Sequence, residues 1–327
     1  MKVIRIATAA LAMALGIAVQ TGSGCAHADY PTRTVKLIVP YPPGGGTDLL
    51  ARVLAQQLQQ KWKQSVIVEN VGGAGGNIGA QEVAQAAPDG YTLLLTAPGP
   101  LALNSLVHKA MPYDPAKWVA IDMLATSPFV LAVGSDFAAT NLAQVIADAK
   151  AKPGALTVAT PEIGGLGYFA TIELEQLAHV KFLHVPYAGE GPQVTDLLGG
   201  HVKMTLIDLA PVLSFYRTGK LKIVAVGTTG RFPELPNVPT FAESGLPGYR
   251  AVTFFGLVAP PGTPDALADQ INRDVVNVMK QPAVFQKINA LSLAPSFGSR
   301  ADAAKFFSDQ RALWSKVATE ADINPTH

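Results

Sequence analysis

Short apolar runs alternate with amphipathic stretches along most of the chain. Runs such as residues 35–39 have the length and composition of buried strands. The stretches between them repeat apolar residues at helical spacing, as at Leu50, Val53, Leu54 and Leu58. Strands that alternate with helices favour sheets with crossover connections. The pattern therefore predicts an α/β fold with largely parallel sheets.

The alternation falls into two series. The first has strands at 35–39, 66–68 and 93–95 and helices at about 47–62 and 77–86. The second begins near Phe129, with strands at 129–133, 156–159, 182–185, 204–207 and 223–226 and helices at 142–151, 168–178, 192–198 and 211–217.

The Pro- and Gly-rich segment 231–248 is predicted to be irregular and to lead back to the first series. A strand at 252–258 follows, and then helices at 264–280, from about 283, and at 301–318, which we expect to cover the first lobe. The predicted fold thus has two lobes. Lobe 1 comprises 29–128 with 250–327, and lobe 2 comprises 129–249, with hinge crossings near 127–129 and 249–254.

The N-terminus has the features of a secretory signal peptide. Two basic residues precede an apolar run at 6–19, and Ala26-His27-Ala28 fits the small-x-small cleavage rule. The run is shorter than the ~18 residues that span a bilayer comfortably. We predict a signal peptide at 1–28 and a secreted protein. Lipidation of Cys25 is the alternative, but Gly22 occupies the position where lipoprotein signals usually carry leucine.

Composition narrows the chemistry. The chain has 25 Lys and Arg against 24 Asp and Glu, and removing the predicted signal leaves 25 − 2 = 23 basic residues, which makes nucleic acid an improbable partner. The single cysteine would leave with the signal, which excludes a thiol nucleophile, a disulfide and a cysteine-ligated metal in the mature chain. We therefore predict no metal and no cofactor.

Three strand-to-helix turns are rich in glycine and hydroxyl residues: 41–48, 72–77 and 160–167. Each should end at a helix N-terminus, where unpaired N–H groups and the helix dipole favour an anion. In open α/β sheets such loops lie at the carboxyl ends of strands, where ligands bind. Two lobes with such turns would hold a small molecule that carries carboxylates. Alternatively, each loop merely permits tight backbone geometry.

Motifs for other functions are missing. Gly73-x-Gly75 is followed by Ile78 where a dinucleotide fingerprint needs glycine or alanine, and no Gly-Lys-Ser/Thr occurs. The sequence has no Gly-x-Ser-x-Gly elbow and no His-Glu-x-x-His helix, and its six histidines show no ligand spacing. The sequence thus favours a protein that is not an enzyme.

Several candidate residues have two interpretations. Thr47 is predicted to cap a helix and to border the anion site. Asp48 could be a catalytic carboxylate, but acids also suit the first helical turn for dipole reasons alone. A functional role for Asp48 would be to fix the loop or to hold a bridging water. Asp208 either caps the next helix or lines a pocket. Tyr41 and Tyr168 belong either to the core or to a pocket wall.

Several motifs resemble the Bug-type receptors of tripartite tricarboxylate transporters. They are Pro40-Tyr41-Pro42-Pro43-Gly44-Gly45-Gly46-Thr47-Asp48, Gly73-Ala74-Gly75-Gly76-Asn77-Ile78-Gly79-Ala80, Ala87-Pro88-Asp89-Gly90-Tyr91-Thr92, His184-Val185-Pro186-Tyr187 and Asn237-Val238-Pro239-Thr240. The resemblance runs from Tyr30 nearly to the C-terminus. It implies a periplasmic binding protein with a two-lobed, type II Venus-flytrap fold. The ligands that it implies are di- or tricarboxylates, acidic amino acids or aromatic carboxylates, without catalysis.

The resemblance and the loops together give a predicted ligand-binding set. Its members are Tyr41, Gly45, Gly46, Thr47, Asp48, Gly73, Ala74, Gly75, Asn77, Thr160, Gly164, Tyr168 and Asp208. The 160–169 segment departs from the Ser/Gly/Thr-rich loop of many relatives, which leaves the ligand open. The expected partners are a small carboxylate and the membrane subunits of a transporter, and the chain is expected to be a monomer. A sensor subunit for a membrane kinase shares this fold, and a secreted carboxylate hydrolase or lyase is a third possibility.

Overall fold

The computed structural model describes residues 30–161, 164–187 and 190–325. The predicted signal peptide at 1–28 lies outside the described residues. One compact unit begins at Arg33, and the description below concerns this unit alone. No helix in its described part is long and apolar enough to cross a membrane.

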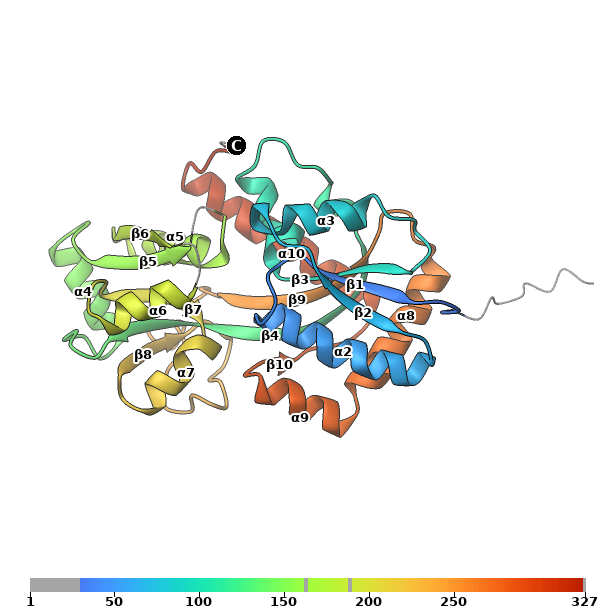
Figure 1. Ribbon diagram of the computed structural model, residues 1–327. Coiled ribbons are helices and arrows are strands. Elements are labelled where there is room, and N and C mark those ends of the chain that lie inside the picture. The colour runs from blue at the N-terminus through green and yellow to red at the C-terminus, as the bar shows by residue number, and fades with distance from the viewer. Residues whose placement is uncertain (1–29, 162–163, 188–189, 326–327) are drawn as a thin grey trace, which may run out of the picture. The chain divides into compact units, whose positions relative to one another are not determined.

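The first lobe is built on a sheet of mixed direction (Figure 1). Strand β1 (Val35–Val39) lies between β2 (Val66–Asn70) and β3 (Thr92–Thr96) and runs parallel to both. Next to β3 lies β9 (Val252–Ala259), which is antiparallel and leads to β4 (Val119–Gly134). The leucines of β3 are fully buried, as expected for a strand with helices on both faces.

The second lobe continues from the other half of β4. There β4 pairs antiparallel with β7 (Met204–Asp208) and with β8 (Leu221–Val226). Strand β5 (Thr157–Pro161) runs parallel to β7 on one side and to β6 (Leu183–Tyr187) on the other. The two-lobed α/β fold is confirmed, and the sheet is parallel at its two ends and antiparallel in its middle.

Strand β4 connects the lobes and is 16 residues long. Its pairing with β9 continues as far as Pro128, which lies opposite Val252. Its pairing with β7 begins one residue later, with Phe129 opposite Asp208. One continuous strand therefore belongs to both lobes, and its pairing partner changes at residues 128–129.

Helices cover both lobes (Figure 1). Those of the first lobe are α2 (Gly46–Trp62), α3 (Asn77–Ala84), α8 (Asp265–Met279), α9 (Pro282–Ala290) and α10 (Arg300–Glu320). Those of the second are α4 (Leu142–Ala151), α5 (Leu166–Ala178), α6 (Glu190–Leu198) and α7 (Ala210–Arg217). Strand β10 (Ala294–Pro295) and the short helical turns η1 (Ala74–Gly76), η2 (Gly99–Leu103), η3 (Asn104–Leu106) and η4 (Pro115–Lys117) complete the fold.

Helix α10 contacts both lobes, so the expectation that the C-terminal helices cover the first lobe alone is incomplete. The fully buried Trp314 of α10 packs against Phe169 of α5, with 6.1 Å between the ring centroids. The side chain of Gln176 donates a hydrogen bond to the carbonyl oxygen of Val317 at 3.3 Å. The C-terminal end of the chain therefore bridges the lobes on the side of α5.

Two segments depart from the sequence-based expectation. Residues 119–128 form the first half of β4, although only 129–133 was predicted as a strand. Residues 99–106 form the turns η2 and η3, which were not predicted. Thr126, Ser127 and Pro128 interrupt the apolar run of β4 at the crossing, which explains why its two halves did not read as one strand.

Candidate functional site

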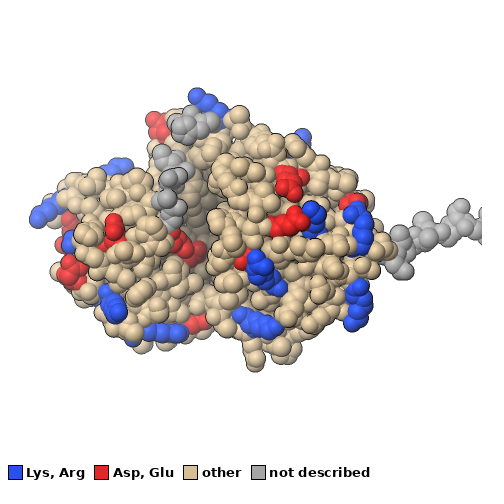
Figure 2. Space-filling view, viewed as in Figure 1, with Lys and Arg blue, Asp and Glu red and all other residues tan. Residues whose placement is uncertain are grey.

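A cavity of about 590 Å³ is lined by residues of both lobes. Figure 2 shows the molecular surface hollowed where the lobes meet. The first lobe contributes the loops that follow β1, β2 and β3, and the second contributes residues from the ends of β5 and β7 and the starts of α5 and α6. The cavity thus lies at the carboxyl ends of parallel strands, as the topology rule predicts.

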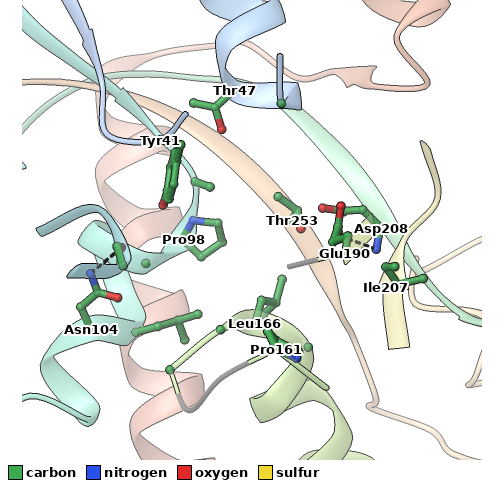
Figure 3. Close-up of a pocket in the computed structure, with 18 of the residues that line it drawn as sticks. Tyr41, Thr47, Pro98, Asn104, Pro161, Leu166, Glu190, Ile207, Asp208 and Thr253 are labelled. Carbon is green, nitrogen blue, oxygen red and sulfur yellow. Dashed lines mark hydrogen bonds between the residues drawn. The ribbon is translucent and has the colours of Figure 1, made fainter. Parts of the chain in front are cut away.

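The N-terminus of α2 faces the cavity from the first lobe. Its N-cap is Gly45, with φ −79° and ψ 168°, and no side chain caps the helix. Gly45 and Thr47 both line the cavity, and Figure 3 shows the Thr47 hydroxyl pointing into it. The prediction that Thr47 caps α2 is wrong, because Thr47 lies inside the first turn. The first N–H groups of α2 therefore have no side-chain partner.

Asp48 fixes the loop before α2. Its carboxylate accepts hydrogen bonds from the backbone N–H of Gly44 at 2.9 Å and from Arg52 Nε at 3.0 Å. Burial alone would raise the pKa of Asp48, but the hydrogen bonds from Arg52 and Gly44 outweigh it and lower this pKa. Arg52 also reaches Asn70 Oδ1 at 3.2 Å, and Asn70 Nδ2 donates to the carbonyl of Tyr41 at 3.1 Å. Asp48 is thus a neutralised acid whose role is to hold the loop.

The second glycine loop adopts a left-handed turn. Gly73, Ala74, Gly75 and Gly76 have φ of 127°, 49°, 63° and 93°, a run that only glycine-rich sequence adopts at low cost. Asn104 supports the turn, because its Nδ2 donates to Gly75 O at 3.0 Å and to Asn77 Oδ1 at 2.7 Å. Asn77 is buried and also accepts from the Tyr113 hydroxyl at 2.6 Å. These contacts fix the backbone of Ala74 and Gly75 at the cavity wall.

The N-terminus of α5 faces the cavity from the second lobe. Its N-cap is Gly165, again with no side-chain cap, and the helix begins two residues before its predicted start. Gly167 allows α5 to pack tightly, because a Cβ there would lie 2.9 Å from the carbonyl oxygen of Leu206 and 2.9 Å from Pro161 Cδ. Two helix N-termini without side-chain caps therefore meet one cavity from opposite lobes.

Two acidic residues form the remaining wall of the second lobe (Figure 3). Asp208 ends β7, Glu190 begins α6, and the backbone N–H of Asp208 donates to Glu190 Oε1 at 3.4 Å. Asp208 Oδ1 is buried without a hydrogen-bond partner. Helix α7 begins after Leu209 and has no side-chain cap, which rules out the capping interpretation of Asp208. Burial raises the pKa of both carboxyls, and their mutual repulsion adds to the rise at Glu190.

Basic side chains are scarce around the cavity. Among the described residues that line it, only His108 can carry a positive charge. Tyr41 lines the first lobe, and burial raises the pKa of its hydroxyl to about 12, so this group stays protonated. In the described part of the chain no group of three or more His, Cys, Asp or Glu side chains could hold a metal ion. The donors available to a ligand are therefore mainly backbone N–H and hydroxyl groups.

The structure brings most of the predicted residues to the cavity. Those that line it are Tyr41, Gly45, Thr47, Asp48, Ala74, Gly75, Gly164 and Asp208. The other five, Gly46, Gly73, Asn77, Thr160 and Tyr168, do not line it. Gly46 packs close to Phe255, Gly73 close to Ile78, and Thr160 is fully buried. Tyr168 of α5 packs edge-on against His184 of β6. Ligand contact by these five residues stays a prediction.

Sequence reasoning missed several residues that line the cavity. The segment Ala97-Pro98-Gly99, with Asn104 after it, follows β3. Its Pro and Gly residues at the carboxyl end of a strand were a usable signal. Glu190 and Thr253 had no comparable signal, because one lies at the start of α6 and the other inside β9.

Comparison with known proteins gives a consistent result. The model of the tripartite tricarboxylate transporter receptor family, TctC, matches residues 50–323. Protein BugT of Bordetella pertussis is 36% identical over 294 residues, covering 89% of this chain and 90% of that protein.

Solved structures agree with this match. An R. palustris protein with adipate has a TM-score of 0.82 and 34% identity, covering 91% of this chain and 100% of that one. The periplasmic binding protein BugD has a TM-score of 0.78 and 29% identity, covering 91% and 100%. MatC of Rhodopseudomonas palustris, with bound malate, has a TM-score of 0.77 and 29% identity, covering 88% and 100%. The chain belongs to the tripartite tricarboxylate transporter receptor family.

Proposed function

We propose that the protein is a periplasmic receptor that captures a small carboxylate and delivers it to a tripartite tricarboxylate transporter. The observation that carries the proposal is the pair of helix N-termini, α2 and α5, that face one cavity from opposite lobes. Each has a glycine N-cap and no side-chain cap. Unpaired N–H groups and the positive end of the helix dipole favour a carboxylate at both positions.

The similar solved structures support this substrate class. One was solved with adipate and another with bound malate, both small dicarboxylates. Glycine at the cavity wall lets the backbone approach such a ligand closely. We propose binding without catalysis, because the motifs of nucleophilic and metal-dependent hydrolases are missing from the sequence.

The proposal includes export and partners. We propose that the signal peptide is cleaved after Ala28, that the mature protein is a monomer, and that it docks on the membrane subunits of the transporter. Intact mass of periplasmic protein tests the first point. A chain that starts at Asp29 agrees with the proposal, and a diacylglyceryl adduct on Cys25 contradicts it.

We also propose that the lobes move about residues 127–129 and 249–254. The change of pairing partner along β4 at 128–129 supports a hinge there. Ligand contacts from both lobes would favour a closed state. Small-angle scattering should then show a smaller radius of gyration with ligand. An unchanged radius together with an unchanged distance between labels on the two lobes would contradict closure.

The ligand itself provides the decisive test of function. We expect mass spectrometry of protein purified under native conditions to find a bound small carboxylate. The ligand-free protein should gain thermal stability from the same compound, by about 2.7 kcal/mol at one hundred times its dissociation constant. Stabilisation by sugars or metal cations alone, with none from carboxylates, would contradict the proposal.

A further inference from the structure

The acidic pair Glu190 and Asp208 is unusual in a cavity built for carboxylates. Figure 3 shows both side chains together beside Thr253, on a wall separate from Thr47 and from Leu166 at the two helix N-termini. Both acids line the cavity. The backbone hydrogen bond from Asp208 to Glu190 fixes their spacing, and Asp208 Oδ1 is buried with no hydrogen-bond partner among the residues that the structure describes.

In the described part of the chain, no basic side chain pairs with Glu190 or Asp208. Arg52 is bound to Asp48 in the first lobe, at 2.9 Å between Arg52 Nη2 and Asp48 Oδ1. The other titratable groups among the described lining residues are Tyr41, His108 and Tyr187. Tyr187 donates its hydroxyl proton to Asp196 at 2.6 Å, so its proton is already used. The hydroxyl groups of Thr253 and Ser127 act on Asp208 and offset part of the rise in its pKa, but both groups are neutral.

A ligand can satisfy this wall in two ways. A ligand that presents only carboxylates must meet protonated acids here, since two ionised carboxyls would repel it. A ligand that presents an ammonium group pairs with ionised acids and donates hydrogen bonds to the carboxylate groups of Glu190 and Asp208 that line the cavity. Buried acceptors without a partner are costly, and hydrogen bonds to charged groups are among the stronger ones. The second arrangement satisfies more of the groups present.

We propose that the natural ligand carries a protonated amine in addition to its carboxylate, and that Glu190 and Asp208 bind this amine. This inference rests on the proposed function, because the helix N-termini of α2 and α5 still bind the carboxylate end. Glu190 and Asp208 are then the residues that distinguish an amino carboxylate from a simple dicarboxylate.

Proton linkage gives the proposal a distinctive signature. Burial raises the pKa of both acids, so the ligand-free pair holds a proton to a higher pH than ordinary carboxyl groups do. An ammonium group ionises the pair, and binding then releases a proton. A dicarboxylate has the opposite effect, because it favours the protonated pair and binding takes up a proton. Calorimetry in buffers of different ionisation enthalpy measures the sign of this exchange.

The test compares ligands of equal chain length. Succinate, glutarate and adipate are each titrated beside the amino acid in which an amine replaces one carboxylate and beside the dicarboxylate that carries an α-amine. We expect an amine-bearing member to bind about tenfold or more tightly than its parent dicarboxylate, with proton release. If dicarboxylates bind more tightly throughout, the inference is wrong and the proposed function stands. If no member of any set binds, the carboxylate function itself is wrong.

Variants of Glu190 and Asp208 test whether these two acids cause the preference for an amine-bearing ligand. Glu190→Gln and Asp208→Asn should each weaken binding of the amine-bearing ligand about tenfold or more, abolish proton release, and leave the parent dicarboxylate bound as well as before or better. Asp148→Asn removes an exposed acid from α4 of the same lobe and should change neither ligand. His108→Asn removes the imidazole that lines the cavity, and the proton release on binding should remain. Equal weakening of both ligand classes by Glu190→Gln and Asp208→Asn would overturn the proposal, and thermal unfolding confirms that each variant is folded.

Discussion

The acidic residues on the two walls of the cavity differ in their partners and in the direction of their pKa shifts. In the first lobe Asp48 is held by Arg52 and by the N–H of Gly44, which lower its pKa. In the second lobe Asp208 and Glu190 have no basic partner within the described ranges, and burial raises the pKa of both. Asp48 stabilises the loop that shapes the cavity, whereas the Glu190–Asp208 pair is costly until a ligand compensates it. A paired acid indicates architecture, and an unpaired acid in a cavity indicates recognition.

The largest effect is expected at the start of α5. Gly167→Ala places a Cβ within 2.9 Å of Leu206 O and Pro161 Cδ, which forces the N-terminus of α5 away from β7. Such overpacking costs about 1–3 kcal/mol of stability. It should weaken carboxylate binding about tenfold or more, because the N–H groups move. Gly191→Ala, where a Cβ has nothing within 4 Å, is the matched control, and equal affinity in both variants would remove α5 from the site.

The next prediction compares the stability of one variant from each wall in the ligand-free protein. Asp48→Asn should destabilise by about 1 kcal/mol, because it weakens charged hydrogen bonds that hold the loop. Asp208→Asn should stabilise by about 1 kcal/mol at pH above neutral, because it removes a buried, unpaired charge. Urea denaturation of both variants measures the two signs.

The pH dependence of these two variants follows from the direction of each shift. The pKa of Asp48 is lowered, so its stabilising effect is present above the unfolded-state pKa and is lost as pH falls through the folded one. The pKa of Asp208 is raised, so the free protein loses stability as pH rises through the folded pKa. Asp208→Asn should therefore lose its advantage in acid. A change in stability of the same sign for both variants at alkaline pH would contradict the difference between the two walls.

Glu173 provides an unpaired acid outside the cavity. It is buried in α5, its Oε2 has no hydrogen-bond partner, and burial raises its pKa to about 8. Stability should fall by up to about 1.4 kcal/mol per pH unit from the ordinary carboxyl pKa until pH reaches the raised one. Glu173→Gln should flatten this profile without changing ligand preference. A change of ligand preference would show that unpaired acids act through stability and not through contact.

The smallest effect is expected at Thr47. Its hydroxyl points into the cavity and does not cap α2. Thr47 is buried but caps no helix, so Thr47→Val should cost no more than about 1 kcal/mol of stability. Loss of one neutral hydrogen bond should weaken the ligand about threefold to tenfold. A large loss of stability with unchanged affinity would restore a purely structural role for Thr47.

Local sequence patterns predicted most of the helices and strands. Buried strands such as β1 and helices such as α2 and α4 could be predicted from periodicity and from the residues at their boundaries. The three glycine-rich loops predicted many of the residues that line the cavity. The first half of β4 was missed because polar residues interrupt it where its pairing changes. Glu190 was missed because its role depends on packing beside Asp208, and 18 residues separate the two in the sequence. Contacts between distant residues leave little trace in one sequence.

The most direct measurement of the central claim is calorimetric titration with a small carboxylate and with its uncharged amide of the same shape. The acid should bind, the amide should bind at least about tenfold more weakly, and Gly167→Ala should reduce this difference, because the helix N-termini of α2 and α5 act on charge. Equal binding of acid and amide, or binding of neither across the dicarboxylates and amino carboxylates, would contradict a carboxylate receptor built on these two helix N-termini.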